Sequence, residues 1–266
     1  MIKLIVCDVD GTLLPHGEKR ISYDIEKLVI EAQSKGISFA AASGRAYHEL
    51  KRLFEGLKVW HIPSDGAAAI YNEETLFKNN IPFFVADKLV KALTETEKIA
   101  AVATGKYMSY IIKGENIDSG FNHRITSVLN GHAVCAENIS EVDEDILKLS
   151  FYGEAKSVFG KKLLSGTADN LIKVIYKDNV WTDFVSAGAG KKAAVLKLMK
   201  LLKLEPDEIA VIGDGDNDTD MMRTTKNSVA VKGGSENAVK AAKYITSDVN
   251  KTLGFIIRKG EICDVL

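Results

Sequence analysis

Short runs of consecutive apolar residues alternate in this chain with stretches whose apolar residues recur every three to four positions. Runs of four to six apolar residues are typical of strands buried on both faces of a parallel sheet, and the longer period is typical of amphipathic helices. The runs lie at residues 4–7 and 209–212 and, each with one serine, at 37–42 and 228–231. Their alternation with helical periods predicts an α/β fold built on a doubly wound, mostly parallel sheet.

The helical periods have recognisable ends. The first predicted helix begins after Ser22, a suitable N-cap, and stops at Gly36, with an apolar face made of Ile25, Leu28, Val29 and Ala32. Further helices are expected around residues 50–57, 85–93, 191–202 and 238–242. Residues 67–71 and 75–78 are expected to pair as a hairpin around Asn72-Glu73.

The pattern changes in the middle of the chain. Between residues 82 and 186, short helices and hairpins follow one another without returning to an acidic strand end. We therefore expect an inserted α+β module there, and a core domain made of residues 1–81 and 187–266. Within the module, the polar stretch 114–132 is interpreted as a surface loop.

Acidic residues follow two of the apolar runs. The run 4–7 is followed by Asp8 and Asp10, two residues apart, and then by Gly11, which permits a turn. The run 209–212 is followed by GDGDND at residues 213–218. A single such segment is also compatible with an ordinary acidic turn. Two of them at the carboxyl ends of neighbouring parallel strands predict a site where a cation offsets the repulsion between carboxylates.

The second acidic loop is not an EF-hand. Counting from Asp214, Thr219 stands at position six and Thr225 at position twelve, where a calcium loop carries Gly and Glu.

An anion site is expected near the same sheet edge. Ser43, Gly44 and Arg45 follow the run 37–42 and precede a helix, so the Ser43 hydroxyl and free backbone N–H groups could bind a phosphoryl oxygen. Ser43 could equally be only the helix N-cap, and Arg45 only a surface residue.

Two lysines begin the predicted helix 191–202. A lysine at a helix N-terminus is disfavoured by the helix dipole, which hints at a nearby anion. Lys191 directly follows the Gly188-Ala189-Gly190 turn and is the preferred candidate, with Lys192 as the alternative. A solvent-facing pair is the simpler interpretation of the two residues.

Composition narrows the class of partner. The chain has 35 basic and 36 acidic side chains and a net charge of −1, so no overall field attracts nucleic acid or a membrane surface. A small-molecule partner is expected. No signal peptide or membrane-spanning run is recognised, which suggests a cytoplasmic protein. Three scattered cysteines without a CxxC pair predict neither a disulfide framework nor a zinc site.

The motifs together resemble those of phosphatases in the haloacid dehalogenase superfamily, in the Cof-type subgroup with a large α/β cap. The family's DxDGT corresponds to residues 8–12, its Ser or Thr to Ser43 in AASGR, its Lys to Lys191, and its GDxxND to residues 213–218. The four motifs occur in family order, and the resemblance covers essentially the whole chain. It implies a Rossmann-like core with an inserted cap domain that selects the substrate.

The resemblance also implies a reaction. Asp8 would attack phosphorus and form an aspartyl-phosphate, and Asp10 would protonate the leaving oxygen and then activate water. Mg²⁺ would be held by Asp8, the backbone carbonyl of Asp10, and Asp214, while Asp218 would bind near the ion or orient Lys191. The phosphoryl group would be held by Thr12, Ser43, Gly44, Arg45, Asn217 and Lys191. The substrate would be a small phosphorylated metabolite, with sugar phosphates as the leading class.

Two positions depart from the family pattern. Many members carry Asn-Gly-Ala where this chain has Asp65-Gly66-Ala67, and Lys-Gly where it has Lys191-Lys192. An amide can donate a hydrogen bond whereas an ionised Asp can only accept, so we expect a changed substrate preference at Asp65. A phosphomutase and a non-catalytic ligand-binding protein of the same fold remain alternatives. The acid at Asp10 favours phosphate ester hydrolysis over dehalogenation or ion pumping.

Overall fold

A computed structural model of the chain describes residues 1–262, except 16, 95–98, 113–132, 154–169 and 178–179. The chain divides into two compact units, Met1–Phe77 with Gly190–Leu266 (unit 1) and Lys78–Ala189 (unit 2). The sequence-based limits for the inserted module were residues 82 and 186. The stretch 114–132, interpreted as a surface loop, lies outside the described residues.

Unit 1 is built on an eight-stranded sheet in the order β14-β13-β12-β1-β2-β3-β4-β5. Its strands are β1 (Leu4–Asp8), β2 (Ser38–Ala42), β3 (Trp60–Ile62), β4 (Ala68–Tyr71), β5 (Glu74–Lys78), β12 (Ile209–Gly213), β13 (Ser228–Val231) and β14 (Tyr244–Thr246). The strands from β14 to β3 pair in parallel, and β4 turns antiparallel to β3. The predicted doubly wound α/β class is confirmed.

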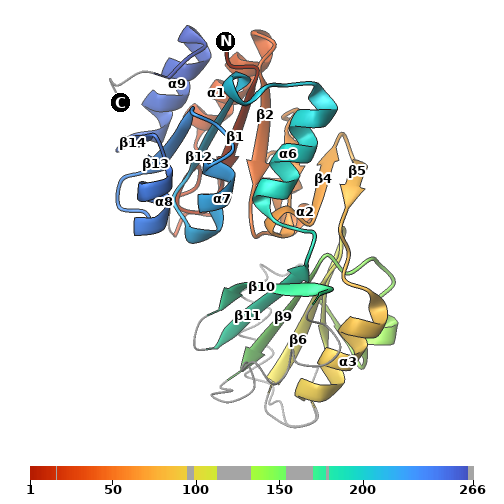
Figure 1. Ribbon diagram of the computed structural model, residues 1–266. Helices are drawn as coiled ribbons and strands as arrows, with labels where there is room; N and C mark the ends of the chain where they lie inside the picture. Colours follow the sequence, from red (N-terminus) through yellow and green to blue (C-terminus); the bar gives the residue numbers. More distant parts are fainter. Residues whose placement is uncertain (16, 95–98, 113–132, 154–169, 178–179, 263–266) are drawn as a thin grey trace. The chain divides into compact units, whose positions relative to one another are not determined.

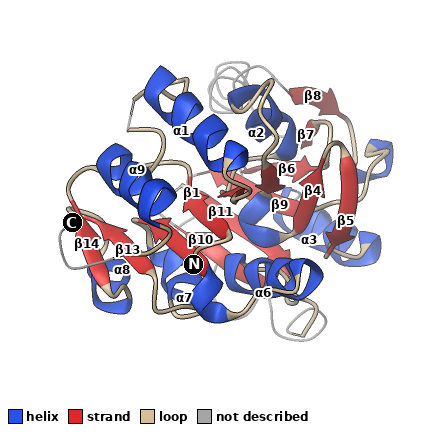
Figure 2. Ribbon diagram, turned by 90° about the horizontal axis from the view of Figure 1, so that it is seen from above, coloured by secondary structure: helices blue, strands red, loops and turns tan. Residues whose placement is uncertain are grey.

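Helices cover both faces of this sheet. Figure 2 shows α1 (Tyr23–Ser34) and α9 (Val249–Lys259) on one side and α6 (Lys191–Leu202), α7 (Thr219–Met222) and α8 (Glu236–Ala241) on the other. Successive residues of β1 supply both layers: Ile5 packs with α1 and α9, and Val6 with α6 to α8. Helix α2 (Tyr47–Leu53) joins the first layer. Burial on both faces explains the continuous apolar run in β1.

Helix caps, apolar periods and turn residues in the sequence predicted most of the elements of unit 1 correctly. Helix α1 has the expected buried face, and the Ser22 Oγ accepts a hydrogen bond from the Ile25 N–H at 3.3 Å. The two-residue turn at Asn72 and Glu73 has φ of 48° and 70°, the left-handed pair that a tight hairpin turn requires.

The structure differs from the sequence-based expectation at several elements, among them the helices α2, α7 and α9. Helix α2 ends at Leu53, so Leu57 lies outside it. The C-terminal helix α9 was missed, although Asp248 as N-cap and Gly260 as C-cap are suitable end signals. Leu253 and Ile256 of α9 are fully buried against the sheet.

Unit 2 is a six-stranded sheet in the order β10-β11-β9-β6-β7-β8, with α3 (Phe83–Thr94) packed on one face (Figure 1). Its strands are β6 (Ile99–Thr104), β7 (Ser109–Ile112), β8 (Ala133–Ala136), β9 (Lys148–Gly153), β10 (Ile172–Lys177) and β11 (Trp181–Ser186). Its core includes Phe151 and Phe184, edge to face with ring centroids 5.8 Å apart.

The described residues of the two units also form short 3₁₀ turns, which are η1 (Ser64–Gly66), η2 (Ile139–Glu141), η3 (Pro206–Glu208) and η4 (Asp216–Asp218). Among the described residues, no helix has the length and apolar character to span a membrane.

Candidate active site

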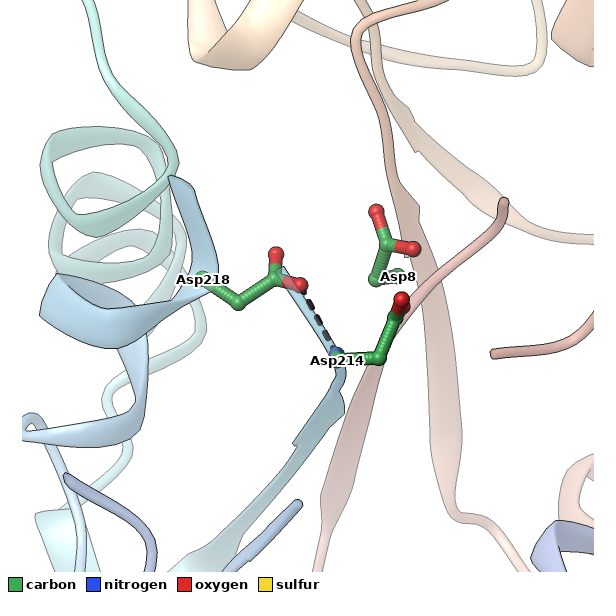
Figure 3. Close-up of side chains that lie close together, drawn as sticks. All are labelled: Asp8, Asp214 and Asp218. Carbon is green, nitrogen blue, oxygen red and sulfur yellow. Dashed lines mark hydrogen bonds between the residues drawn. The ribbon is translucent and has the colours of Figure 1, made fainter. Parts of the chain in front are cut away.

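The carboxyl ends of β1 and β12 bring two acidic segments together. The strands pair in parallel up to Cys7 and Ile212, so Asp8 and the loop after Gly213 emerge at the same sheet edge. Carboxylate oxygens of Asp8, Asp214 and Asp218 all lie within 4.8 Å of one another. Figure 3 shows these three side chains, one from the end of β1 and two from the loop after β12. Three convergent carboxylates can hold a hard divalent cation.

Lys191 begins α6 and reaches into this cluster. Its Nζ lies 2.5 Å from the Asp8 Oδ1 and 2.7 Å from the Asp218 Oδ1, and the residue is 2% exposed. Lys192 is exposed to solvent. The sequence alternative in which both lysines face solvent is therefore wrong.

Burial and the neighbouring charges have opposite effects on the pKa values of Asp8 and Lys191. Burial raises the pKa of the Asp8 carboxyl well above its ordinary value, Asp218 and Asp214 raise it further, and Lys191 counteracts the increase. Burial would lower the pKa of Lys191, but Asp8, Asp218 and Asp65 outweigh it and raise that pKa. Lys191 is thus held as a cation beside carboxylates that would otherwise repel one another.

Asp218 uses both of its oxygens within the protein. While Oδ1 faces Lys191, Oδ2 accepts hydrogen bonds from the Asp214 N–H at 3.0 Å and the Gly215 N–H at 2.9 Å. A Cβ at Gly213 would lie 2.6 Å from this Oδ2, so the close approach requires glycine. These contacts suit a residue that orients Lys191 and shapes the loop.

Asp214 is also held from the first motif. The Thr12 Oγ1 donates to the Asp214 Oδ1 at 2.7 Å, across 202 positions of sequence. Gly11 has φ of +86°, and a Cβ there would lie 2.3 Å from the Asp214 Oδ2. The absence of a side chain at Gly11 therefore leaves room for the Asp214 carboxylate.

The side chain of Asp10 is not one of the clustered carboxylates. It forms a two-pronged ion pair with Arg45, whose Nη2 lies 2.6 Å from Oδ1 and whose Nε lies 2.9 Å from Oδ2. The Ser43 hydroxyl lies 3.4 Å from Asp10 Oδ2 and accepts from the Arg45 N–H at 3.1 Å. Hydrogen bonding to Asp10 raises the pKa of Arg45. The ion pair was not foreseen, because neither motif by itself indicates it.

Ser43 is not the N-cap of α2. That position belongs to Ala46, whose N–H donates to the Glu49 carboxylate at 3.1 Å. The capping interpretation of Ser43 is wrong, and its buried hydroxyl lies among the site residues instead.

A further contact joins the site to the turn after β3. The Asn217 Nδ2 donates to the Asp65 Oδ1 at 2.9 Å, and Gly44 lies directly beside the same carboxylate. The structure thus brings Asp8, Thr12, Ser43, Gly44, Arg45, Asp65, Lys191, Asp214, Asn217 and Asp218 to one sheet edge, next to Asp10. The link between positions 65 and 217 had no sequence signal other than the unusual Asp65 itself.

Comparisons with known proteins identify chains similar to this one. The model of the haloacid dehalogenase-like hydrolase family matches residues 5–255. A curated relative, the 5-amino-6-(5-phospho-D-ribitylamino)uracil phosphatase YbjI of Escherichia coli, is 25% identical over 262 residues, covering 94% of this chain and 92% of its own length.

Solved structures have the same fold at lower identity. A protein of Eubacterium rectale superposes with a TM-score of 0.84 at 22% identity, covering 97% of this chain and 99% of its own. The haloacid dehalogenase subclass IIB sugar phosphatase BT4131 superposes with a TM-score of 0.77 at 19% identity, covering 98% of this chain and 100% of its own.

Proposed function

This chain belongs to the haloacid dehalogenase-like hydrolases, and from that premise we propose that it is a magnesium-dependent phosphatase acting through an aspartyl-phosphate. The observation that carries the proposal is the arrangement around Asp8. This carboxylate ends a buried strand, contacts the buried ammonium of Lys191, and lies beside two more carboxylates. A nucleophilic carboxylate, a fixed cation and a cation site are the components that phosphoryl transfer needs.

The donor set fits Mg²⁺. All three clustered side chains offer hard carboxylate oxygens, and their mutual repulsion is reduced when a divalent cation binds. We assign the ion to Asp8, the backbone carbonyl of Asp10, and Asp214. Asp218, whose oxygens already bind Lys191 and two backbone amides, orients this set. When bound, Mg²⁺ supplies charge that offsets the negative phosphoryl oxygens.

The protein's own groups account for the bonds that change. An oxygen of Asp8 attacks phosphorus, the P–O bond to the leaving group breaks, and the leaving oxygen takes a proton from Asp10. Asp10 then removes a proton from water, which attacks phosphorus and releases phosphate and the Asp8 carboxylate. Thr12, Ser43 and Lys191 hold the phosphoryl oxygens during both steps.

The ion pair between Asp10 and Arg45 fits this cycle. An incoming phosphoryl group competes for the Arg45 guanidinium, because planar two-pronged donors bind phosphate and carboxylate alike. Release from Arg45 leaves Asp10 able to exchange a proton. Gly44 and Asn217 complete the proposed phosphate site.

We propose small phosphorylated metabolites as substrates, with sugar phosphates foremost. The support comes from two relatives, one named for a phosphate on a ribityl chain and one named a sugar phosphatase. Unit 2, the inserted α+β module, is assigned the role of a cap that selects the leaving group. A cytoplasmic location, where such metabolites are made, is part of the same proposal.

A phosphate-release screen over sugar phosphates, nucleotides and cofactor phosphates, with and without Mg²⁺, tests this function. We expect Mg²⁺-dependent release that falls by at least about a thousandfold in Asp8→Asn, because the amide cannot act as the nucleophile. Asp220→Asn, at an exposed carboxylate paired with Arg223, is the matched control and should keep full activity. Full turnover by Asp8→Asn would refute the proposal, and an isomerised sugar phosphate in place of free phosphate would indicate a phosphomutase.

A further inference from the structure

The short turn η1 (Ser64–Gly66) touches three loops of the candidate site. The Ser64 N–H donates to the Arg45 carbonyl at 2.8 Å, and the Asp65 N–H donates to the Ser43 carbonyl at 2.9 Å. Ser64 and Asp65 both have positive φ, 49° and 54°, which is costly for residues other than glycine. Such a conformation persists only where the surrounding contacts hold it.

The same turn packs against the start of α6. A Cβ at Gly66 would lie 2.3 Å from the Gly190 carbonyl oxygen and 2.7 Å from the Lys191 nitrogen. The turn therefore lies in direct contact with the backbone that presents Lys191 to Asp8.

The Asp65 side chain makes the third connection. The residue is 4% exposed, and its Oδ1 accepts from the Asn217 Nδ2 at 2.9 Å. Its Oδ2 lies beside Gly44, where a Cβ would be 3.1 Å away. Asn217 stands within η4, between Asp214 and Asp218. Asp65 and Asn217 are 152 positions apart in sequence, and the buried Asp65 carboxylate thus connects the acidic loop with the Ser43 loop.

A carboxylate at position 65 also specifies how Asn217 is oriented. An ionised Asp can only accept, so it binds the amide nitrogen of Asn217 and leaves the amide oxygen on the opposite side, towards Gly215. An amide at position 65 could present either an acceptor or a donor to Asn217. The charged residue therefore selects one arrangement of the acidic loop.

We propose that Asp65 is a positioning residue that, through Asn217, holds the Asp214–Asp218 loop in the geometry that binds Mg²⁺. The inference rests on the proposed function for the identity of the cation. It assigns Asp65 no contact with substrate. Partners that orient metal ligands are typically worth about 10- to 100-fold in metal affinity or activity.

Calorimetric titration with Mg²⁺ tests the proposal without reference to activity. We expect Asp65→Ala and Asn217→Ala each to raise the Kd for Mg²⁺ about tenfold. The double variant should bind no more weakly than either single variant, because both changes remove the same contact. Asp65→Asn, which keeps an acceptor oxygen, should raise the Kd less than Asp65→Ala. Asp220→Asn should leave it unchanged.

Activity adds a second measurement. Phosphate release by Asp65→Ala should be low at limiting Mg²⁺ and recover at saturating Mg²⁺, whereas a general loss of structure would not be rescued by the ion. Asn217 is exposed, so Asn217→Ala is expected to fold even if Asp65→Ala does not.

Three outcomes separate this inference from the proposed function. A Kd unchanged in both Asp65→Ala and Asn217→Ala would overturn the positioning role while leaving the phosphatase proposal intact. Additive losses in the double variant would also overturn it. A wild-type protein that binds Mg²⁺ and releases no phosphate would refute the function, and the Kd comparison would still decide the role of Asp65.

Discussion

At the scale of single residues, the site depends on one buried ammonium. Lys191 lies between Asp8 and Asp218, both of which are nearly inaccessible to solvent. Removing one partner of such a cluster leaves the remaining charges uncompensated, at a cost of about 3–5 kcal/mol in buried pairs. The neighbouring Lys192 is exposed and has no comparable environment. The two adjacent lysines are therefore predicted to behave very differently.

We predict that Lys191→Ala lowers kcat by at least about a hundredfold, since it removes a charge that stabilises the transferring phosphoryl group. Lys192→Ala should retain nearly full activity. Steady-state phosphate release, with the folded fraction checked by circular dichroism, measures both. The reverse ranking would assign the catalytic role to Lys192.

At the scale of secondary-structure elements, a histidine joins α2 to the sheet. His61 of β3 pairs with Ile70 of β4, and its ring lies edge-on to Tyr47 and Phe54 at centroid distances of 5.4 and 6.2 Å. Burial lowers the pKa of His61 from 6.5 to about 4, outweighing the backbone of Ile70. The neutral ring is thus part of the packing between these elements.

This pKa predicts an acid-sensitive fold. Between pH 6.5 and about 4 the unfolded chain binds a proton at His61 that the folded chain does not, so stability falls as the pH drops through this window. The full shift corresponds to about 3 kcal/mol in the free energy of unfolding. In His61→Phe, the decrease in the free energy of unfolding that His61 causes between neutral pH and pH 4 should be absent.

Urea unfolding of both proteins at several pH values measures the effect. The difference between the two stabilities should grow as the pH falls and level off near pH 4. Parallel stability curves over the whole window would mean that His61 does not contribute.

At the scale of the whole molecule, the described chain forms two units with separate hydrophobic cores. All residues assigned to the cation and the phosphate lie in unit 1, while Phe151 and Phe184 belong to the core of unit 2. Cation binding and the packing of unit 2 should therefore respond to different substitutions.

We predict that Phe151→Ala destabilises unit 2 by about 3–5 kcal/mol, because it leaves a cavity in the core, without changing the Kd for Mg²⁺. Phe39→Ala, at a fully buried position in β2 of unit 1, is the matched substitution and should weaken Mg²⁺ binding. Hydrogen exchange localises the destabilised unit, and calorimetry gives the Kd. Equal weakening of Mg²⁺ binding by both variants would contradict this separation.

Local patterning was sufficient to predict the α/β class, the strands β1 and β12, and helix α1 with its N-cap Ser22. The reason is that a strand buried on two faces, a helical period and a helix cap each leave a signal within a few consecutive residues. Parallel pairing then carries Asp8 and Asp214 to one edge, which makes their proximity predictable from strand direction.

Contacts between side chains distant in the chain could not be obtained in this way. The hydrogen bond from Asn217 to Asp65 and the ion pair of Asp10 with Arg45 depend on how separate loops pack and on which rotamers that packing allows. Neither is encoded by a period or a cap. The order and parallel direction of the strands, which the sequence indicates, bring Asp8 and Asp214 together. Tertiary packing decides that Asp10 pairs with Arg45 and that Asp65 accepts a hydrogen bond from Asn217.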